Sequence, residues 1–240
     1  MAGFKAIYAR AAKRKGGTAA LEALLPKPPK DAALKKLGDD RVLAEMTRRV
    51  FCAGFNWKVI DNKWPGFEAA FLGFQPKPLL FKPDEFWDRL ASDSRIVRHA
   101  AKIMSVRGNA RFVDETAKEH GSFGKFLAAW PASDIVGLLD LLGKRGDRLG
   151  GNTGQYFVRF IGKDSFITSR DMVACLRDSG LDIAEQPSSK RDMRKIQDQF
   201  NAWAKETGRS LTELSRICAM SIGENYSADM LRRGAGLSED

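Results

Sequence analysis

The chain has 240 residues, of which 43% are hydrophobic, and its 40 Lys and Arg outnumber its 30 Asp and Glu. This length can bury a full core in one large domain or two small ones, and the net charge of +10 favours nucleic acid as a partner over an anionic membrane surface. No segment approaches the roughly 18 apolar residues of a membrane span, and the N-terminus lacks the apolar stretch of a signal peptide. We therefore expect a monomeric, cytoplasmic protein without membrane association.

The cysteine and histidine content argues against a metal or disulfide scaffold. Cys52, Cys175 and Cys218 show no CxxC spacing, and His99 and His120 are the only histidines. A tetrahedral zinc site needs four such ligands, and a disulfide framework needs paired cysteines. We predict reduced, buried thiols, no metal and no cofactor.

Apolar residues recur at intervals of three and four almost throughout, which predicts an all-α protein. A short helix over residues 18–25 ends at Pro26, and the following Pro-Lys-Pro-Pro-Lys sequence to Lys30 predicts an extended basic connector. Residues 1–38 are therefore expected to form a loosely attached basic arm. The main domain, residues 39–222, begins with a helix that Asp39 and Asp40 cap.

Further helices follow in the middle of the chain. Residues 65–74 place three phenylalanines on one side of a helix, and Pro83 opens the next. A long helix is predicted over residues 94–120. Two short helices, over 123–130 and 132–142, lead to a glycine-rich turn.

Residues 144–157, Lys-Arg-Gly-Asp-Arg-Leu-Gly-Gly-Asn-Thr-Gly-Gln-Tyr-Phe, place this turn directly before an apolar helix. Consecutive glycines let the backbone approach an anion, and a helix that begins near Asn152 or Thr153 directs its free N–H groups toward that anion. The pattern indicates a hairpin that binds the DNA backbone, with a plain surface turn as the alternative. The expected phosphate contacts are Lys144, Arg145, Gly150, Gly151, Asn152, Thr153 and Gly154.

The C-terminal part contains well-marked helix starts. Ser169 caps a helix from Arg170, and a longer helix covers residues 188–205. The sequence Ser210-Leu-Thr-Glu213 is a capping box that begins a last helix through Met220. Residues 223–240 are predicted to be a mobile tail.

Three ordered sequence blocks, covering about residues 42–176, together resemble one known family. The first runs from Ala53-Gly-Phe-Asn-Trp57 to Phe67-Glu-Ala-Ala-Phe71-Leu-Gly-Phe74-Gln-Pro76. The second is Ile96-Val-Arg-His-Ala-Ala-Lys-Ile-Met-Ser-Val-Arg-Gly-Asn-Ala-Arg111, and the third is the hairpin through Tyr156. In this order they resemble the DNA-3-methyladenine glycosylase I family of helix-hairpin-helix DNA glycosylases.

The resemblance implies two helical lobes that enclose a cleft, in which double-stranded DNA with a damaged base presents one flipped nucleotide. It further implies a monofunctional glycosylase of base excision repair that hydrolyses the N-glycosidic bond of an alkylated or otherwise modified purine, similar to 3-methyladenine. Trp57 is the expected wall of the base pocket, beside Phe55 and Asn56, although an ordinary core indole is the alternative. Asp171 matches the superfamily's catalytic aspartate, unless the alignment shifts by one and places Arg170 there.

Several positions depart from the family. In the family, the glutamate that recognises the base precedes the pocket tryptophan by eight residues. In this chain that position is Arg49. Two alternative functions follow: a glycosylase for a different modified base, or a catalytically inactive protein that binds damaged DNA. Glu45, one helical turn earlier, could substitute as the catalytic or base-recognising acid, or could form a solvent-exposed i,i+4 pair with Arg49. The family's zinc ligands have no counterparts in residues 1–40, and Gln155 stands where strand-cleaving members have a lysine, so no lyase activity is expected.

Four more residues are candidates by position within the resemblance. Arg98 and Lys102 lie within one helical turn and could contact phosphate, or could be ordinary solvated cations. Trp64 and Pro65 are expected in a loop that could supply a wedge for the gap left by the flipped base. A helical interaction domain whose basic surface only aids solubility is a third possibility for the whole chain.

Overall fold

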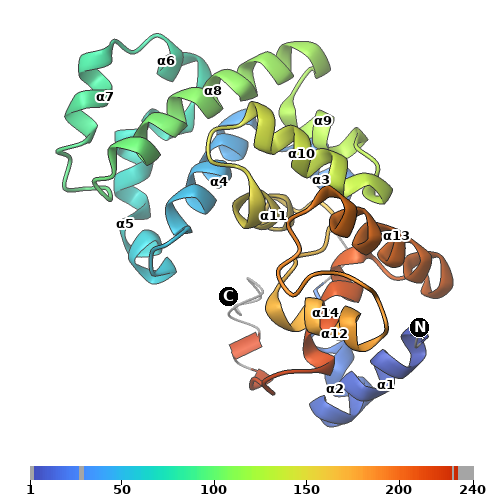
Figure 1. Ribbon diagram of the computed structural model, residues 1–240. Coiled ribbons are helices and arrows are strands. Elements are labelled where there is room, and N and C mark those ends of the chain that lie inside the picture. Colours follow the sequence, from blue (N-terminus) through green and yellow to red (C-terminus); the bar gives the residue numbers. More distant parts are fainter. Residues whose placement is uncertain (1–2, 27–29, 229, 232–240) are drawn as a thin grey trace. The chain divides into compact units, whose positions relative to one another are not determined.

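The computed structural model describes residues 3–26, 30–228 and 230–231. Every regular element within these ranges is a helix, which confirms the predicted all-α class (Figure 1). The chain divides into two compact units. The terminal unit comprises Met1–Pro29, Ala132–Val136 and Asp164–Asp240, and the central unit comprises Lys30–Pro131 and Gly137–Lys163.

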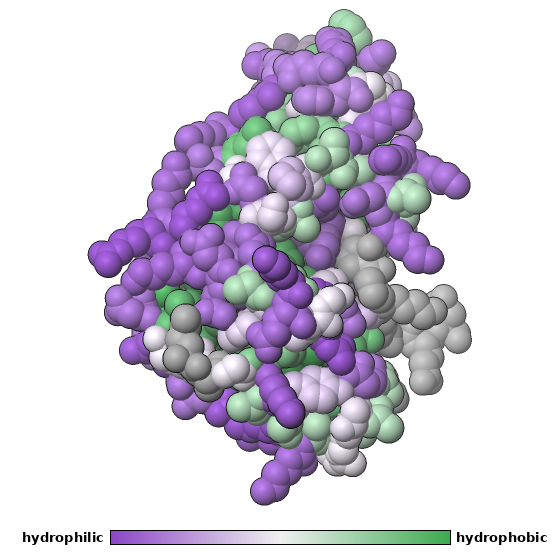
Figure 2. Space-filling model, turned by 90° about the vertical axis from the view of Figure 1, so that its right-hand side faces the viewer, coloured by the Kyte–Doolittle hydropathy of each residue, from purple (hydrophilic) through white to green (hydrophobic). Residues whose placement is uncertain are grey.

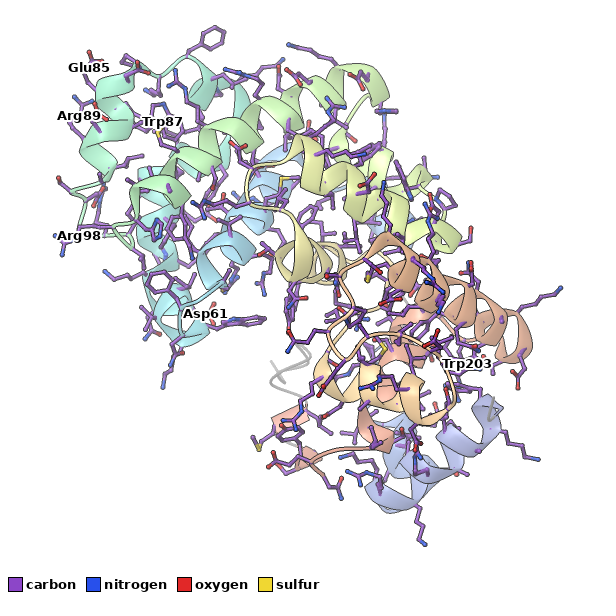
Figure 3. All side chains as sticks on the ribbon, viewed as in Figure 1. Asp61, Glu85, Trp87, Arg89, Arg98 and Trp203 are labelled. Carbon is purple, nitrogen blue, oxygen red and sulfur yellow. The ribbon has the colours of Figure 1, made fainter. Side chains whose placement is uncertain are left out.

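The central unit is organised around the 21-residue helix α8, which packs against α4, α6, α7 and α9 (Figure 1). Trp87 is buried and points from α7 toward α8 (Figure 3). The helices of this unit are α3 (Asp31–Lys35), α4 (Asp39–Cys52), α5 (Trp57–Ala70), η1 (Leu72–Phe74), α6 (Pro76–Leu80), α7 (Asp84–Leu90), α8 (Ala100–His120), α9 (Phe123–Ala129), α10 (Ile135–Arg145, whose first two residues belong to the terminal unit) and α11 (Gly151–Phe160).

Two helices of the central unit begin at residues other than those predicted. Helix α5 begins at Trp57 instead of residue 65, because the side chain of Asn56 accepts a hydrogen bond from the Lys58 N–H at 3.0 Å and Pro65 is accommodated inside the helix. Helix α8 begins at Ala100 instead of residue 94, where Nδ1 of His99 accepts from the Lys102 N–H at 3.4 Å. In both cases a side-chain cap decides the start.

The terminal unit is built on α14, which packs against α1, α12 and α13. Phe4 and Ile7 of α1 are only 2% exposed, so the predicted loose arm is wrong for this part of the chain. Its apolar residues repeat at helical spacing and therefore cover α14. The helices of this unit are α1 (Phe4–Lys15), α2 (Thr18–Glu22), η2 (Ala132–Asp134), α12 (Arg170–Asp178), α13 (Lys190–Thr207) and α14 (Leu211–Ser221).

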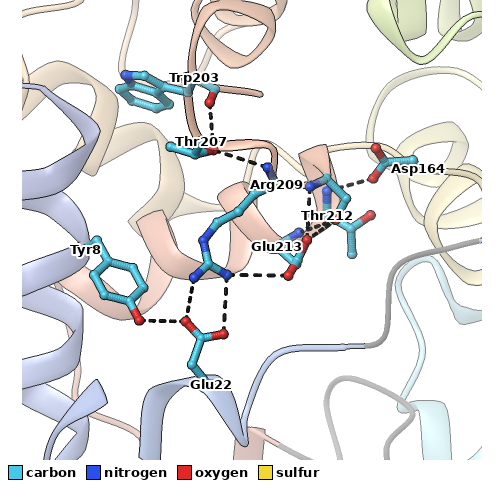
Figure 4. Close-up of polar contacts among 9 residues, drawn as sticks. Tyr8, Glu22, Asp164, Trp203, Thr207, Arg209, Thr212 and Glu213 are labelled. Atoms are coloured by element: carbon cyan, nitrogen blue, oxygen red, sulfur yellow. Dashed lines mark hydrogen bonds and ion pairs between the residues drawn. The ribbon is translucent and has the colours of Figure 1, made fainter. Parts of the chain in front are cut away.

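A polar network joins α2 to the start of α14 (Figure 4). Arg209 donates from Nη2 to Oε1 of Glu22 at 2.5 Å, and the Tyr8 hydroxyl donates to the same oxygen at 2.6 Å. The predicted capping box between Ser210 and Glu213 is present, and Ser169 caps α12 as expected. These contacts anchor the N-terminal helices to the rest of the unit.

The segment after α14 is held against the end of α1. Arg14 donates to the carbonyl oxygens of Met220 and Gly223, and Nζ of Lys15 donates to Oδ1 of Asn225 at 2.7 Å. The predicted mobile tail therefore does not begin at residue 223. Its last part, residues 232–240, and the centre of the predicted connector, residues 27–29, lie outside the described residues.

The polar residues are distributed widely over the surface. Figure 2 shows hydrophilic side chains over most of the visible face, with small apolar patches between them. Within the described ranges no single helix has the length and apolar content to cross a membrane. Only Phe123–Ala129 and Ala132–Arg145 taken together, with a sharp bend between them, reach that length and composition.

Candidate nucleic-acid interface

The glycine-rich turn joins α10 to α11 and leaves the start of α11 open. Gly150 is the N-cap of α11 and offers no side-chain hydrogen bond, and Gly151 adopts a φ of +56°, which favours glycine. Gly150, Gly151 and Asn152 are all exposed. The helix begins at Gly151, slightly earlier than expected. Its first-turn N–H groups therefore lack a side-chain cap and can accept an anionic ligand.

Asn109 of α8 holds the turn, a role that the sequence pattern does not reveal. Nδ2 of Asn109 donates to the Asp147 carbonyl at 3.1 Å, and the Asp147 N–H donates to Oδ1 of Asn109 at 2.8 Å. A Cβ on Gly108 would lie 1.7 Å from Oδ2 of Asp147. A larger residue at 108 would thus require the Asp147 side chain to move, which shows how closely α8 and the hairpin pack here.

Two other predicted phosphate contacts, Gly154 and Thr153, are less exposed than Gly150, Gly151 and Asn152. Gly154 is buried, and a Cβ there would lie 2.3 Å from the carbonyl oxygen of Leu149. Gly154 thus permits close packing within the hairpin and is not a phosphate contact, which corrects our prediction. Thr153 is half-buried in the first turn of α11.

Lys144 and Arg145 lie at the end of α10, and each forms an ion pair within the protein. Nζ of Lys144 is 2.8 Å from Oδ2 of Asp140, and Nη2 of Arg145 is 3.3 Å from Oε2 of Glu115. The Arg145 guanidinium also lies 4.9 Å from the ring centre of Phe112. Ion pairs at the surface contribute little to the free energy of folding, so a DNA phosphate can compete with these carboxylates for both cations.

Arg98 and Lys102 differ in their exposure to solvent although they are only four residues apart in sequence. Arg98 is exposed and projects from the loop before α8 (Figure 3). Lys102 is only 6% exposed, and its ammonium donates to the carbonyl oxygens of Phe51 and Ala53 at the end of α4. Burial, followed by the charge of Arg148, lowers the pKa of Lys102. The prediction of Lys102 as a phosphate contact is therefore wrong, because its donors are already used inside the protein.

An aromatic cluster, made of Trp57, Tyr156 and Phe160, lies where the start of α5 meets α11. The Trp57 ring is edge-on to Tyr156 at 5.5 Å and to Phe160 at 5.6 Å, measured between ring centres. Trp57 is 38% exposed, so it is not an ordinary core indole. An exposed indole next to two further rings can stack against a base.

Arg49 projects from α4 into this aromatic cluster. Its guanidinium carbon lies 4.2 Å from the ring centre of Phe160 and 4.9 Å from that of Trp57. Nε of Arg49 is 2.7 Å from Oε1 of Glu45, and the two side chains are 6% and 18% exposed. The expected i,i+4 pair is thus present, but it is buried instead of solvent-exposed, because the aromatic rings cover it.

The ionisation of Glu45 reflects this environment. Burial raises the pKa of Glu45, while the positive charge of Arg49 opposes that rise. Nε of Arg49 is paired with Glu45, but Nη1 makes no hydrogen bond within the described residues and is shielded from solvent. The buried guanidinium therefore has unused donors beside the exposed indole.

The remaining residues near Trp57 position the backbone. The side chain of Asn56 caps α5, and Phe55 is 38% exposed, with the Lys102 ammonium 4.5 Å from its ring centre. Trp64 and Pro65 lie inside α5, and the Trp64 ring stacks on Phe67 and Phe74. The expected wedge loop is therefore wrong, since both residues belong to a helix and Trp64 is packed in the aromatic core.

Asp171 lies in the terminal unit, in the first turn of α12. It borders a cavity of about 580 Å³ that Lys15, Arg170, Arg216 and Tyr226 also line. A Cβ on Gly223 would lie 2.4 Å from Oδ1 of Asp171, so the chain after α14 passes directly beside the carboxylate. Asp171 is half-buried, with cationic and phenolic side chains around the same cavity.

The described residues also bear on lyase chemistry and on metal binding. Gln155 is buried in α11, so no amine stands at that position. Among the described residues, no group of three or more His, Cys, Asp or Glu side chains could hold a metal ion.

The comparison with known families agrees with the motifs. The methyladenine glycosylase family model matches residues 34–136, which confirms the predicted resemblance over this range. DNA-3-methyladenine glycosylase 1 of Escherichia coli (strain K12) is 36% identical over 59 residues, which are 25% of this chain and 32% of that protein. The match thus spans about a third of the length of this curated relative.

Two of the solved structures that match this chain are those of DNA glycosylases. The 3-methyladenine DNA glycosylase I of Staphylococcus aureus has a TM-score of 0.47 and 21% identity, with 64% of this chain and 85% of that chain covered. The 8-oxoguanine glycosylase/lyase of Methanocaldococcus jannaschii, solved with 15mer DNA containing 8-oxoguanine, has a TM-score of 0.46 and 15% identity, with 81% of this chain and 86% of that chain covered.

Proposed function

We infer, from the match of residues 34–136 to the methyladenine glycosylase family, that this chain is a monofunctional DNA glycosylase. It would remove a modified purine from double-stranded DNA by hydrolysis of the N-glycosidic bond, as a monomer in the cytoplasm. The observation that best supports the proposal is structural. An uncapped, glycine-rich helix start and a partly exposed indole cluster are both supplied by α11 and its neighbours in the central unit.

The hairpin provides the contact with the DNA backbone. The exposed Gly150 and Gly151 let a phosphate approach the first N–H groups of α11, where the helix dipole favours negative charge. Asn109 holds the turn in this conformation from α8. Contacts of this kind bind the backbone without regard to sequence, as a repair enzyme that inspects many sites requires.

The aromatic cluster provides a surface for the flipped base. A base rotated out of the duplex loses its stacking, and an indole such as Trp57 can replace part of that interaction. Trp57 is the exposed member of the cluster, and Tyr156 and Phe160 support its ring from α11.

Hydrolysis requires stabilisation of the positive charge that develops on the sugar. A carboxylate can provide it, or can accept a proton from the attacking water. The water oxygen bonds to the anomeric carbon and its proton passes to the carboxylate, while the base departs with the electron pair of the N-glycosidic bond; a base that is neutral in DNA takes up a proton as it leaves. We assign the carboxylate to Asp171, which borders a cavity, in preference to Glu45, whose carboxylate is paired with Arg49. Gln155 cannot form a Schiff base, so no strand cleavage is expected.

A glycosylase screen tests the proposal directly. Duplexes that contain methylated, deaminated or oxidised purines should yield free base, with strand cleavage only after alkali. Asp171→Asn should reduce the single-turnover rate by at least 100-fold with little loss of DNA affinity, because the charge acts mainly in the transition state. Asp182→Asn, at a 93% exposed carboxylate of the same unit, is the control and should leave the rate unchanged.

The second candidate function is damaged-DNA binding without catalysis, which the guanidinium of Arg49 in the base pocket favours. Such a protein would bind duplexes that contain a lesion and release no base from any of them. Because both candidates bind phosphates, only product analysis separates them. Intact base in every duplex of the screen, at full binding, would contradict the glycosylase proposal.

A further inference from the structure

A buried cation that the proposed hydrolysis does not use lies against the aromatic cluster. Arg49 is 6% exposed and lies between Phe160 and Trp57, while Glu45 on the same helix holds its position. Trp57 is far more exposed than Arg49, so the indole lies on the solvent side of the guanidinium. A base that binds next to Trp57 therefore lies close to the guanidinium of Arg49.

The guanidinium has hydrogen-bond donors without acceptors. Nε of Arg49 is 2.7 Å from the Glu45 carboxylate, whereas Nη1 makes no hydrogen bond within the described residues and is shielded from solvent. Buried donors of this kind normally find a partner, because an unpaired one loses its hydration without compensation. A ligand with suitably placed acceptors would satisfy them.

Purines differ in the acceptors that they can offer. A 6-oxopurine presents two adjacent acceptors, O6 and N7, which match the planar fork of an arginine, whereas adenine presents an amino donor in place of O6. A methylated adenine such as 3-methyladenine also carries a positive charge in DNA. Both its amino group and its charge are unfavourable next to a guanidinium in a site of low dielectric constant.

We propose that Arg49 makes this pocket selective for a neutral 6-oxopurine with an unmodified N7, of which hypoxanthine is the simplest example, over a cationic methylated adenine. This inference rests on the proposed glycosylase function and specifies its substrate class. The base lies against the exposed indole of Trp57, and the terminal nitrogens of Arg49 donate to its O6 and N7. Unmodified guanine is protected by its pairing with cytosine, since a mispaired base such as hypoxanthine opposite thymine is easier to flip.

Single-turnover excision from matched duplexes tests the selectivity. The unmodified full chain should remove hypoxanthine opposite thymine about 10- to 100-fold faster than 3-methyladenine, the range expected for one bidentate contact. Arg49→Glu should reverse this order, because a carboxylate accepts from the amino group and attracts the cationic base. Arg49→Lys should retain less selectivity, since the ammonium lacks the planar fork.

Arg48→Gln is the matched control. Arg48 is the neighbouring arginine on α4, pairs with Asp61 and lies over the Trp64 ring, 5.1 Å from its centre. The substitution should leave the ratio of the two excision rates unchanged. Reversal by Arg48→Gln as well would overturn the assignment to Arg49.

The outcomes distinguish this inference from the proposed function. Faster removal of 3-methyladenine than of hypoxanthine by the unmodified protein would overturn the inference and leave the glycosylase function intact. No excision from any duplex would instead contradict the function. If Arg49→Glu fails to fold, DNA binding by the slow variant Asp171→Asn decides: the duplex with hypoxanthine should bind at least 10-fold more tightly than the duplex with 3-methyladenine, and the opposite order would overturn the inference.

Discussion

At the scale of single residues, buried polar side chains of the central unit serve different purposes. Lys102 donates to two carbonyl groups at the end of α4 and so holds the turn that leads to Trp57. Arg49, on α4 itself, has donors with no acceptor in the protein. A satisfied cation is part of the scaffold, whereas an unsatisfied one beside an exposed ring is a candidate for ligand recognition.

A second buried polar group lies in the terminal unit, between α1, α12 and α14. The hydroxyl of Ser221 donates to Sγ of Cys175 at 3.2 Å, and Nη2 of Arg10 lies 3.8 Å from the same sulfur. Hydrogen bonding from Cys218, supported by Ser221 and Arg10 and opposed by burial, lowers the pKa of Cys175 to about 7. The folded unit therefore stabilises a thiolate there.

This thiolate predicts a pH dependence of stability. An acid whose pKa is lower in the folded state stabilises the fold above its unfolded pKa, and this contribution is lost as the pH falls through the folded pKa. Between pH 7 and pH 9 the free energy of unfolding should thus increase by about 2 kcal/mol. Cys175→Ala should remove this increase, measured by urea unfolding at several pH values.

Cys52→Ala is the control for that experiment. Burial raises the pKa of Cys52, so its thiol contributes no gain in stability with pH in this range. The increase between pH 7 and pH 9 should persist in Cys52→Ala. The same pH dependence in Cys175→Ala as in the unmodified protein would show that another group is responsible.

At the scale of elements, the hairpin between α10 and α11 depends on glycine where one part of its backbone closely approaches another. A Cβ at position 154 would meet the backbone oxygen of Leu149, which cannot move without distorting the turn. Gly143, at the end of α10, is different: a Cβ there would lie 3.5 Å from the Cα of Gly150, an ordinary contact.

This difference predicts opposite effects of the same substitution. Gly154→Ala should destabilise the protein by about 1–3 kcal/mol, the usual cost of overpacking, and should weaken DNA binding because the N–H groups of α11 are displaced. Gly143→Ala should be neutral or stabilise by up to about 1 kcal/mol, since alanine favours a helix. Thermal unfolding and fluorescence anisotropy with a labelled duplex measure both. Unchanged DNA affinity in Gly154→Ala, together with reduced stability, would exclude the hairpin from DNA binding.

At the scale of the whole molecule, the net charge of +10 should govern association with DNA, although many cations are already paired within the protein. Arg98 is exposed on the loop before α8, whereas Lys118, near the other end of α8, is 2.6 Å from Oδ2 of Asp114. Each phosphate contact releases about one counterion from the duplex.

The salt dependence of binding therefore predicts which cations touch DNA. The affinity should fall steeply between 50 and 200 mM salt, by roughly 10³-fold if about six phosphates are contacted. Arg98→Ala should reduce the slope of log K against log salt by about 1, while Lys118→Ala should leave it unchanged. An unchanged slope in Arg98→Ala would exclude Arg98 from the interface.

Local patterns in the sequence were sufficient to predict the class of fold and most helices. The capping box at Ser210, the cap at Ser169 and the helical periodicity of α4 are interactions between near neighbours, and the family motifs also lie in short contiguous blocks. The start of α5 differs from the prediction because Pro65, which is typical of a helix beginning, lies inside the helix, and Asn56 caps a start at Trp57, well before the predicted start at residue 65.

The sequence by itself thus determined an all-helical chain with a glycine hairpin and the resemblance to the glycosylases, because these features depend on residues close together along the chain. Only the tertiary structure decided that Lys102 is internal, that α1 is packed on α14, and that Arg49 and Glu45 form a buried pair under Trp57. Burial depends on which distant segments meet. A one-dimensional pattern can therefore identify a cation but not its environment.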